Sequence, residues 1–165
     1  MNTDELNEAL EKLDWKCAGG GCSGNNNKGV FAADLLPPCN LLLRKGNYMI
    51  VNTDPVNESG THWLAVYCPD DGTVEVFDSY GFDLETYPTV KRFLVDRCRP
   101  KLIRSMEGGP IQEENSDVCG AHCIFYLAMR MCHGLSMEDI VNSVYTNNLL
   151  LNDCLALHYL CTIVC

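Results

Sequence analysis

The sequence has few basic residues, no long apolar run and no leader-like start. Twelve Lys and Arg stand against 22 Asp and Glu in 165 residues, which gives a net charge of −10. Nucleic acids and anionic membranes attract summed positive charge, so this balance argues against binding of either by the surface as a whole. The most apolar stretch, 149–165, is interrupted by Asn152, Asp153 and His158, and a membrane span needs about 18 uninterrupted apolar residues. We expect a soluble protein without a membrane partner.

Cysteine, by contrast, is abundant, with eleven residues. In a secreted chain this would predict a disulfide scaffold, but the number is odd and the acidic start MNTDELNEALEKL lacks a signal-peptide pattern. The cysteines also do not form the two matched, two-residue-spaced pairs of a zinc site. We therefore expect free thiols in a reducing intracellular compartment and no metal.

The apolar content of 47% is sufficient for one core, and we expect a single domain over 1–165 of the α+β class. Helices are predicted over 3–14, 90–98, 119–132 and 136–144, and strands over 48–53, 61–68, 73–78 and 101–106. Capping boxes at Asn2 with Glu5 and at Ser136 with Asp139 predict two of the helix starts, and Asn152 or Asp153 is expected to cap a last helix. The Gly- and Asn-rich run 18–29 is expected to be a loop.

Cys119 lies where a polar, turn-forming segment (QEENSDV) meets the helix expected over 119–132. That helix is apolar on nearly all sides, as a buried helix is. Unpaired backbone N–H groups and the positive end of the helix dipole stabilise a thiolate at such a position. Gly120, directly after it, leaves room for a substrate backbone. Position therefore favours Cys119 as a nucleophile over one more buried core thiol.

A nucleophilic cysteine needs a base, and His62 is well placed to supply one. It lies in one strand of the hairpin expected over 61–78, and Asp78 ends the other strand, so the carboxylate can orient the imidazole. His122 is the competing candidate, since it follows Cys119 by three residues on the same helix face. A local pair of that kind shows no third member in the sequence and leaves little room for substrate.

Three segments, IVNTDPVNESGTHWLAVY, VFDSYGF and QEENSDVCG, resemble adenain, the adenovirus endopeptidase family, within the larger group that includes the SUMO and other ubiquitin-like proteases. That group has the order histidine, acid, glutamine, cysteine, with a tryptophan after the histidine. This chain has His62, Trp63, Asp78, Gln112 and Cys119 in that order. The offset from glutamine to cysteine is the adenain spacing, while the aspartate in DSYG is nearer to the SUMO-protease form. The resemblance extends over most of the chain.

The resemblance implies an adenain-like cysteine protease fold, with a small mixed sheet packed against a buried helix that starts at the catalytic cysteine and further helices at the C-terminus. It implies Cys119 as nucleophile, His62 as general base and then acid, and Asp78 as orienting carboxylate. Gln112 is the implied oxyanion donor, acting with the backbone N–H of Cys119. Trp63 is expected to help form the wall of the substrate cleft, and the alternative is that it only packs in the core.

The resemblance also implies a reaction and partners. We expect a viral or virus-like endopeptidase that cleaves capsid or core precursor proteins at or beside Gly-Gly or Gly-X sites. We expect it to act as a monomer in the host nucleus and the virion, with no metallic cofactor. Adenain depends on a basic viral peptide, joined through a disulfide, and on DNA as activators. Cys98 is the candidate for that disulfide, against a simpler role as a half-buried thiol at a helix end.

Half of the basic residues gather in one segment, 91–104, which contains a single acid. They are Lys91, Arg92, Arg97, Arg99, Lys101 and Arg104. The cluster predicts a small DNA patch, or a solvated helix face that balances the acidic N-terminal helix. The net charge of −10 favours the solvated face.

Two other function classes use the same sequence features. A deconjugating protease of a ubiquitin-like or SUMO-like modifier would use the same catalytic residues. A non-catalytic assembly or binding protein would keep only a relic of the site, and its Cys119 would resist alkylation near neutral pH.

Overall fold

A mixed five-stranded sheet lies at the centre of the protein. The computed structural model describes residues 1–17, 29–58, 60–106 and 108–164. The strands follow the spatial order β1-β2-β3-β4-β5, with the two outer pairs parallel and the two inner pairs antiparallel. They are β1 (Val30–Ala32), β2 (Tyr48–Asn52), β3 (Trp63–Tyr67), β4 (Thr73–Phe77) and β5 (Leu102–Ser105).

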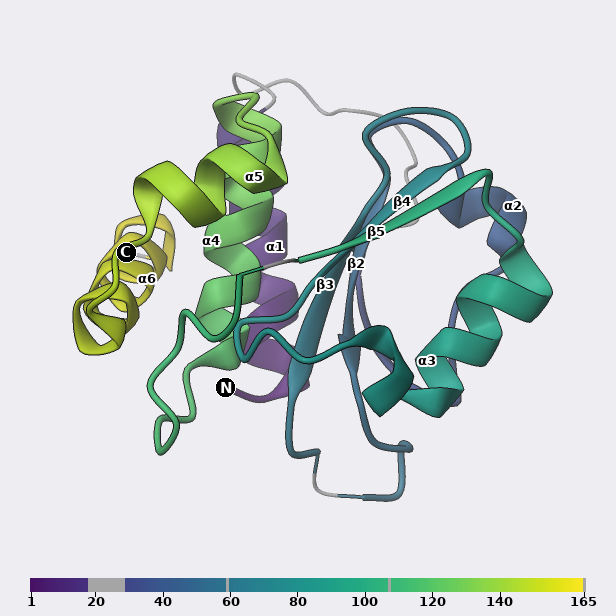
Figure 1. The fold of residues 1–165 in the computed structure, drawn as a ribbon, viewed down its shortest axis with the longest axis horizontal. Coiled ribbons are helices and arrows are strands. Elements are labelled where there is room, and N and C mark those ends of the chain that lie inside the picture. Colours follow the sequence, from purple (N-terminus) through teal and green to yellow (C-terminus); the bar gives the residue numbers. More distant parts are fainter. Residues whose placement is uncertain (18–28, 59, 107, 165) are drawn as a thin grey trace.

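Helices cover both faces of this sheet (Figure 1). One face carries α1 (Thr3–Cys17) and α4 (Cys119–Cys132), with α5 (Met137–Asp139), the π-helical turn η3 (Ile140–Val144) and α6 (Leu149–Val164) packed outside them. The other face carries α2 (Cys39–Leu42), the 3-10 turn η1 (Leu84–Thr86), α3 (Pro88–Arg92) and the π-helical segment η2 (Phe93–Cys98). None of the helices in the described ranges is long and apolar enough to cross a membrane.

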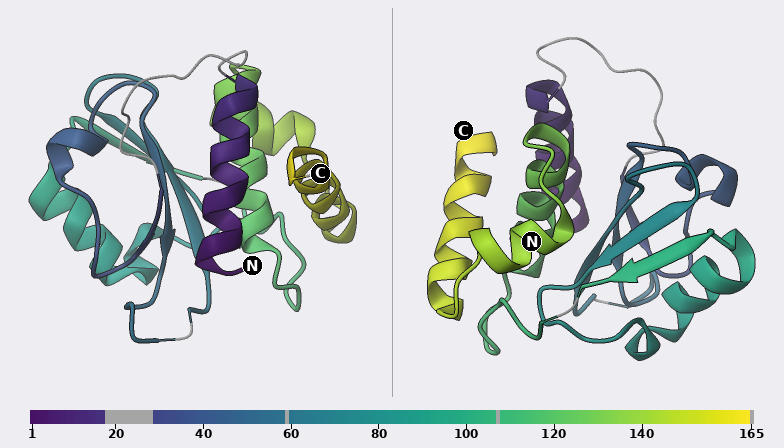
Figure 2. Two further views of the ribbon diagram at one scale, coloured as in Figure 1. Left: turned by 180° about the vertical axis from the view of Figure 1, so that it is seen from behind. Right: turned by 45° about the horizontal axis from the view of Figure 1, so that its top comes forward.

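Helices on both faces bury the central strands. Because successive side chains of a strand point to opposite sides of the sheet, each strand contributes to two cores. One set faces α1 and α4, and includes Tyr48, Ile50, Ala65 and Phe77. The alternate set faces α3 and η2, and includes Met49, Val51, Leu64 and Val66. Continuous apolar runs such as YMIV are what such doubly buried strands require. The sheet therefore lies between helices on both faces, which Figure 2 shows from two further directions.

Several local predictions are confirmed. The α+β class, the mixed sheet, the β3–β4 hairpin and the bounds of the buried helix at 119–132 all agree with the structure. The first capping box is present, since the Glu5 N–H donates to Asn2 Oδ1 and the Asn2 N–H donates to Glu5 Oε2, each at 2.9 Å. The second box, Ser136 with Asp139, begins α5. The hairpin, the helix start and the capping boxes depend on residues close together in sequence, which is why they were predictable, whereas the mixed sheet was implied by the resemblance.

The start of the last helix was predicted wrongly. α6 begins at Leu149, and Asn148 caps it by accepting the Leu151 N–H at 3.1 Å. Asn152 and Asp153 are buried inside the helix. The helix expected over 90–98 begins at Pro88 and becomes π-helical from Phe93, and β1 and α2 were not predicted. The loop expected over 18–29 lies, except for its last residue, outside the described residues.

Among the residues that the structure describes, four cysteines form two disulfides, which corrects the expectation that all thiols are free. Cys17 pairs with Cys132 and joins the ends of α1 and α4, with a Cα–Cα distance of 4.9 Å. Cys39 pairs with Cys98 and joins α2 to η2, again with 4.9 Å between Cα atoms. Cys98, the candidate for an activator disulfide, is therefore already bonded within the chain.

Candidate active site

Cys119 is the first residue of α4, as predicted, and the first eleven residues of the helix are all buried. Val118 precedes it as the N-cap and makes no side-chain capping hydrogen bond. Backbone N–H groups in the first turn of a helix have no intrahelical acceptor, and the helix dipole is positive there. The thiol therefore lies among donors suited to negative charge, on the thiolate and on an oxyanion formed from it.

A second cysteine fixes the orientation of α4 on the sheet. The thiol of Cys123 donates to the carbonyl oxygen of Trp63 on β3 at 3.4 Å. Burial raises the pKa of Cys123 well above its ordinary value, so this thiol stays protonated and remains a donor. Residues four apart share a helix face. The contact therefore directs the face that carries Cys119 toward the chain segment that carries His62.

His62 lies directly before β3 and is 7% exposed. Its Nε2 is 2.7 Å from Asp78 Oδ1, as the hairpin predicted. Its Nδ1 is buried and has no well-aligned hydrogen-bond partner among the described residues. Nδ1 is thus the nitrogen left for the thiol of Cys119, which is near enough to raise the pKa of the ring.

The electrostatic surroundings of His62 favour its protonated form. Burial alone would lower the pKa of His62, but hydrogen bonding to Asp78 and Cys119 and the negative charges of both groups raise the pKa from 6.5 to about 9. The ring therefore carries a proton at neutral pH. An imidazolium next to a cysteine stabilises the thiolate, which is the nucleophilic form. His62 therefore supplies the positive charge that a nucleophilic cysteine requires.

Asp78 is held by four donors, more than the sequence indicated. Its Oδ1 also accepts the Tyr80 N–H at 2.9 Å. Its Oδ2 accepts the Phe82 N–H at 3.2 Å and the Tyr87 hydroxyl at 2.6 Å. The ring of Tyr87 lies nearly parallel to His62 with centroids 6.0 Å apart, and Tyr80 lies on His62 at 4.9 Å. Sequence reasoning missed both tyrosines, although Tyr80 is only two residues after Asp78 in the DSYG turn.

Gln112 is fully buried and held by side chains from two directions. Its Oε1 accepts the Ser79 hydroxyl at 2.6 Å. Its Nε2 donates to Ser116 O at 2.9 Å, Ser116 Oγ at 3.1 Å and Tyr80 Oη at 3.2 Å. Both amide protons are thus directed at these two residues. The oxyanion role of Gln112 stays a prediction, and it requires one N–H to turn from these partners toward the substrate.

A glycine contact joins the DSYG turn to the loop that carries Gln112. Gly81 has a φ of +69°, and a Cβ there would lie 2.5 Å from the carbonyl carbon of Gly109. No side chain fits at that distance. The backbone N–H groups of Ile111 and Gln112 also both donate to Ser79 O, at 2.9 and 3.1 Å. The aspartate turn and the glutamine loop are therefore in direct contact.

Gly120 and Trp63 lie against the N-terminal helix. A Cβ on Gly120 would be 3.2 Å from Leu6 Cδ2 and 3.3 Å from Met1 Cβ. The start of the chain therefore lies against Gly120 on the side where a side chain would be, and the substrate contact expected of this glycine stays a prediction. The Trp63 indole N–H donates to Met1 O at 3.2 Å, and the ring belongs to the core around α4. Its role in the wall of a cleft stays a prediction.

His122, the competing base, has no nitrogen free for Cys119. It is fully buried, with Nε2 2.9 Å from Asp153 Oδ1 and Nδ1 2.9 Å from Tyr145 Oη. Burial lowers the pKa of His122, although Asp153 acts in the opposite direction. A neutral histidine with both nitrogens bound cannot serve as the base. His122 does have an acidic partner, Asp153, but it is 31 residues further along the chain and no local sequence pattern indicated it.

The six basic residues of the predicted DNA patch lie on different elements, and three of them contact nearby residues of the chain. Lys91 forms an ion pair with Glu85 at 2.5 Å. The Arg99 side chain donates to the carbonyl of Asp96 at 3.0 Å, and Lys101 reaches the carbonyl of Asp71 at 3.4 Å. The remaining members are on α3, η2 and β5. DNA binding by this segment stays a prediction.

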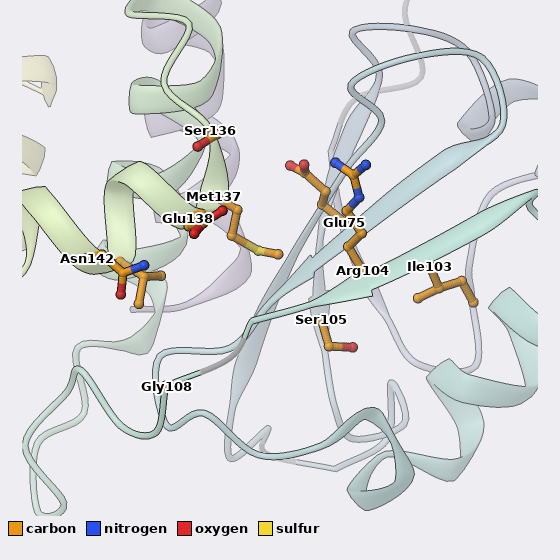
Figure 3. A pocket seen from close by; sticks show the side chains of 10 residues that line it. Glu75, Ile103, Arg104, Ser105, Gly108, Ser136, Met137, Glu138 and Asn142 are labelled. Carbon is orange, nitrogen blue, oxygen red and sulfur yellow. The ribbon is translucent and has the colours of Figure 1, made fainter.

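A cavity of about 820 Å³ lies between strands β4 and β5 and the α5–η3 segment (Figure 3). Its charged lining side chains are Glu75, Arg104 and Glu138. Glu75 is 2% exposed and forms an ion pair with Arg130 of α4 at 2.9 Å. None of the predicted catalytic side chains lines this cavity. Within the described ranges, no group of three or more His, Cys, Asp or Glu is arranged to hold a metal ion.

Comparison with known proteins adds evidence on the fold. No protein-family profile and no curated protein sequence matches the chain. The crystal structure of ASFV pS273R protease matches with a TM-score of 0.56 and 16% identity, over 92% of this chain and 64% of that one. The central domain of the uncharacterized Lpg1148 protein from Legionella pneumophila matches with 0.52 and 14%, over 99% and 97%. The chain therefore shares the fold of part of ASFV pS273R protease. It spans less than two thirds of the length of that protein.

Proposed function

We propose that this protein is a cysteine protease that uses Cys119 and His62. The observation that carries the proposal is the arrangement of His62: Nε2 is 2.7 Å from a buried Asp78, Nδ1 is free for the thiol at the start of α4, and the pKa is raised to about 9. Such an arrangement supplies both a nucleophile and an acid at neutral pH. The fold shared with ASFV pS273R protease supports the same reaction class.

The reaction follows from these groups. The Cys119 thiolate attacks the carbonyl carbon of the scissile bond and forms a C–S bond, and the carbonyl oxygen becomes an oxyanion. First-turn N–H groups of α4, with Gln112 as a further donor, stabilise that charge. His62 gives its proton to the leaving amine, and the C–N bond breaks. Water, deprotonated by His62, then hydrolyses the thioester and releases the thiolate.

We infer that the substrates are structural precursor proteins of a virus, cleaved at or beside Gly-Gly or Gly-X. Two observations support glycine: Cys119 is 5% exposed and His62 is 7% exposed. Only a narrow, flexible backbone can bring its carbonyl to such recessed groups, and glycine has the smallest side chain. The resemblance to adenain and the fold shared with ASFV pS273R protease favour a viral substrate.

The test is cleavage of a glycine-containing peptide library by the wild type and by Cys119→Ala. Each is measured alone, with DNA and with short basic peptides, because the resemblance implies such activators. Cys154→Ala is the matched control, since Cys154 is an exposed free thiol on α6. We expect turnover in the wild type and the control, and a loss of about 10⁴-fold or more in Cys119→Ala. Equal product from wild type and Cys119→Ala in all conditions would refute the proposal.

The same proteins distinguish the other function classes. A ubiquitin-like probe whose C-terminal Gly-Gly is joined to a lysine side chain is cleaved rapidly by a deconjugating protease and slowly by a precursor protease. A relic site gives no turnover, and its Cys119 reacts with iodoacetamide no faster than Cys154.

A further inference from the structure

Two neighbouring residues of α6 hold the backbone on either side of Gln112. The Asn152 side-chain amide donates to the carbonyl of Ile111 at 2.9 Å. Asp153 Oδ1 accepts the N–H of Glu113 at 3.4 Å. Asn152 is fully buried and Asp153 is 4% exposed. The peptide groups before and after Gln112 are thus bound by a helix about 40 residues further along the chain.

The same carboxylate is bound to the helix that carries Cys119. His122 Nε2 lies 2.9 Å from Asp153 Oδ1, and His122 follows Cys119 on α4 by less than one turn. Helices α4 and α6 pack side by side (Figure 2). Asp153 is therefore the junction between the helix of the nucleophile and the loop of the predicted oxyanion donor.

The hydrogen-bond directions in this network are determined by its charges. Burial lowers the pKa of His122, so the ring is neutral. Facing a carboxylate, Nε2 carries the proton and donates it, and Nδ1 accepts the hydroxyl of Tyr145. The other carboxylate oxygen, Oδ2, is buried without a hydrogen-bond partner among the described residues. A buried oxygen of this kind lowers stability, so stability alone does not account for an aspartate here.

We propose that Asp153, together with Asn152 and His122, is a positioning residue that fixes the Gln112 loop relative to Cys119. This inference rests on the proposed protease function, in which Gln112 donates to the oxyanion. The loop is held from the sheet side by Ser79 and from the helix side by Asp153 and Asn152. Release of the helix side lets the amide of Gln112 move away from the position that the oxyanion will occupy.

The test variant is Asp153→Asn, which keeps the size of the side chain and removes its charge. We expect kcat to fall about 10- to 100-fold, as misplacement by about 1 Å does, while KM changes less than about threefold. Alkylation of Cys119 by iodoacetamide forms no oxyanion, so its rate should stay within about twofold of wild type. Asp96→Asn, at an exposed aspartate on η2, is the matched control and should leave both rates unchanged.

A double variant shows whether Asp153 acts through Gln112. If it does, Asp153→Asn causes less than about a twofold further loss in a Gln112→Ala background. Independent, multiplying losses would overturn the proposal, and so would a parallel fall in the alkylation rate, which would place the effect on the nucleophile or on the fold.

Amide exchange of Ile111, Gln112 and Glu113 gives a readout that needs no substrate. These amides should exchange at least about tenfold faster in Asp153→Asn than in wild type, while the amides of β3 stay protected. Wild-type exchange in the variant overturns the positioning role even if the protease is active. Absence of any Cys119-dependent turnover refutes the proposed function instead, so the two failures are distinguishable.

Discussion

His62 with Asp78 and His122 with Asp153 are both buried histidine–aspartate pairs, with N–O distances of 2.7 and 2.9 Å. They differ at the second ring nitrogen. In His62 this nitrogen is free to meet the Cys119 thiol, whereas in His122 it is bound to Tyr145. The pKa of His62 is raised and that of His122 is lowered.

The difference shows what separates the proposed catalytic pair from the second histidine–aspartate pair. Both rings have an acidic partner, so the partner alone identifies neither. The free nitrogen and the interactions with Cys119, added to those with Asp78, are what favour the imidazolium at His62. At His122 burial outweighs the carboxylate, and the neutral ring serves to connect α4 with α6.

The largest contrast is expected from the two Asp→Asn substitutions. Asp78→Asn should lower kcat about 10⁴-fold, because the amide no longer favours the imidazolium or the correct tautomer. Asp153→Asn should cost at most about 100-fold. Single-turnover cleavage of one glycine-containing peptide measures both, and circular dichroism checks that both variants are folded. Similar losses for the two variants would remove the distinction between the pairs.

The pH dependence should separate the two histidines next. A pKa raised from 6.5 to about 9 means that the proton on His62 stabilises the folded state below about pH 6.5, and that this contribution is lost as the pH rises through about 9. Turnover should fall over the same range, by about tenfold per pH unit above it, because the leaving amine loses its acid.

NMR of the imidazole nitrogens in the same protein provides the control. His62 should titrate near pH 9 and His122 only below its ordinary value of 6.5. If turnover still falls near pH 9 while the His62 ring titrates near 6.5, another group supplies the proton.

The smallest effects are expected at the two tyrosines that support the pairs. Tyr87→Phe removes the hydroxyl that donates to Asp78 Oδ2 at 2.6 Å, and should lower kcat/KM about fivefold, the equivalent of about 1 kcal/mol. Tyr145→Phe removes the hydroxyl bound to His122 Nδ1, and should lower the free energy of unfolding by about 1–2 kcal/mol. Cleavage kinetics measure the first effect and urea denaturation the second, and the alkaline limb of the pH profile is recorded for both variants. A shift of that limb in Tyr145→Phe, but not in Tyr87→Phe, would contradict the assignment.

The His62–Asp78 pair was predictable because its members are 16 residues apart and lie next to paired strands of one hairpin. A hairpin places such residues together by local turn geometry. The start of α4 at Cys119 was predictable for a similar reason, since polar turn residues and an apolar helix are adjacent in sequence. The wrong cap of α6 shows the limit of such signals. Asn148, Asn152 and Asp153 are all good capping residues, and only tertiary packing makes Asn148 the cap and buries the other two.

Gly120 shows the same limit. Its position next to Cys119 predicted room for substrate, but it did not indicate that Met1 and Leu6 of α1 lie where its side chain would be. The disulfide of Cys39 with Cys98 likewise joins segments 59 residues apart. No local pattern encodes which distant segment will fill a space or supply a partner, because that choice depends on how the layers pack.

The sequence by itself determined the candidates for the nucleophile, its histidine and the orienting aspartate, because each is placed by a local element: a helix start, a strand start and a strand end. Only the tertiary structure decided which of the two buried histidines keeps a nitrogen for Cys119. At His122 the outcome depends on Tyr145 and Asp153, which reach the ring only when α4 and α6 pack together. At His62 it depends on Asp78, which Tyr87 holds from the start of α3. The physical reason is that burial and hydrogen-bond partners, and not residue type, determine the charge of an imidazole and which of its nitrogens remains unbound.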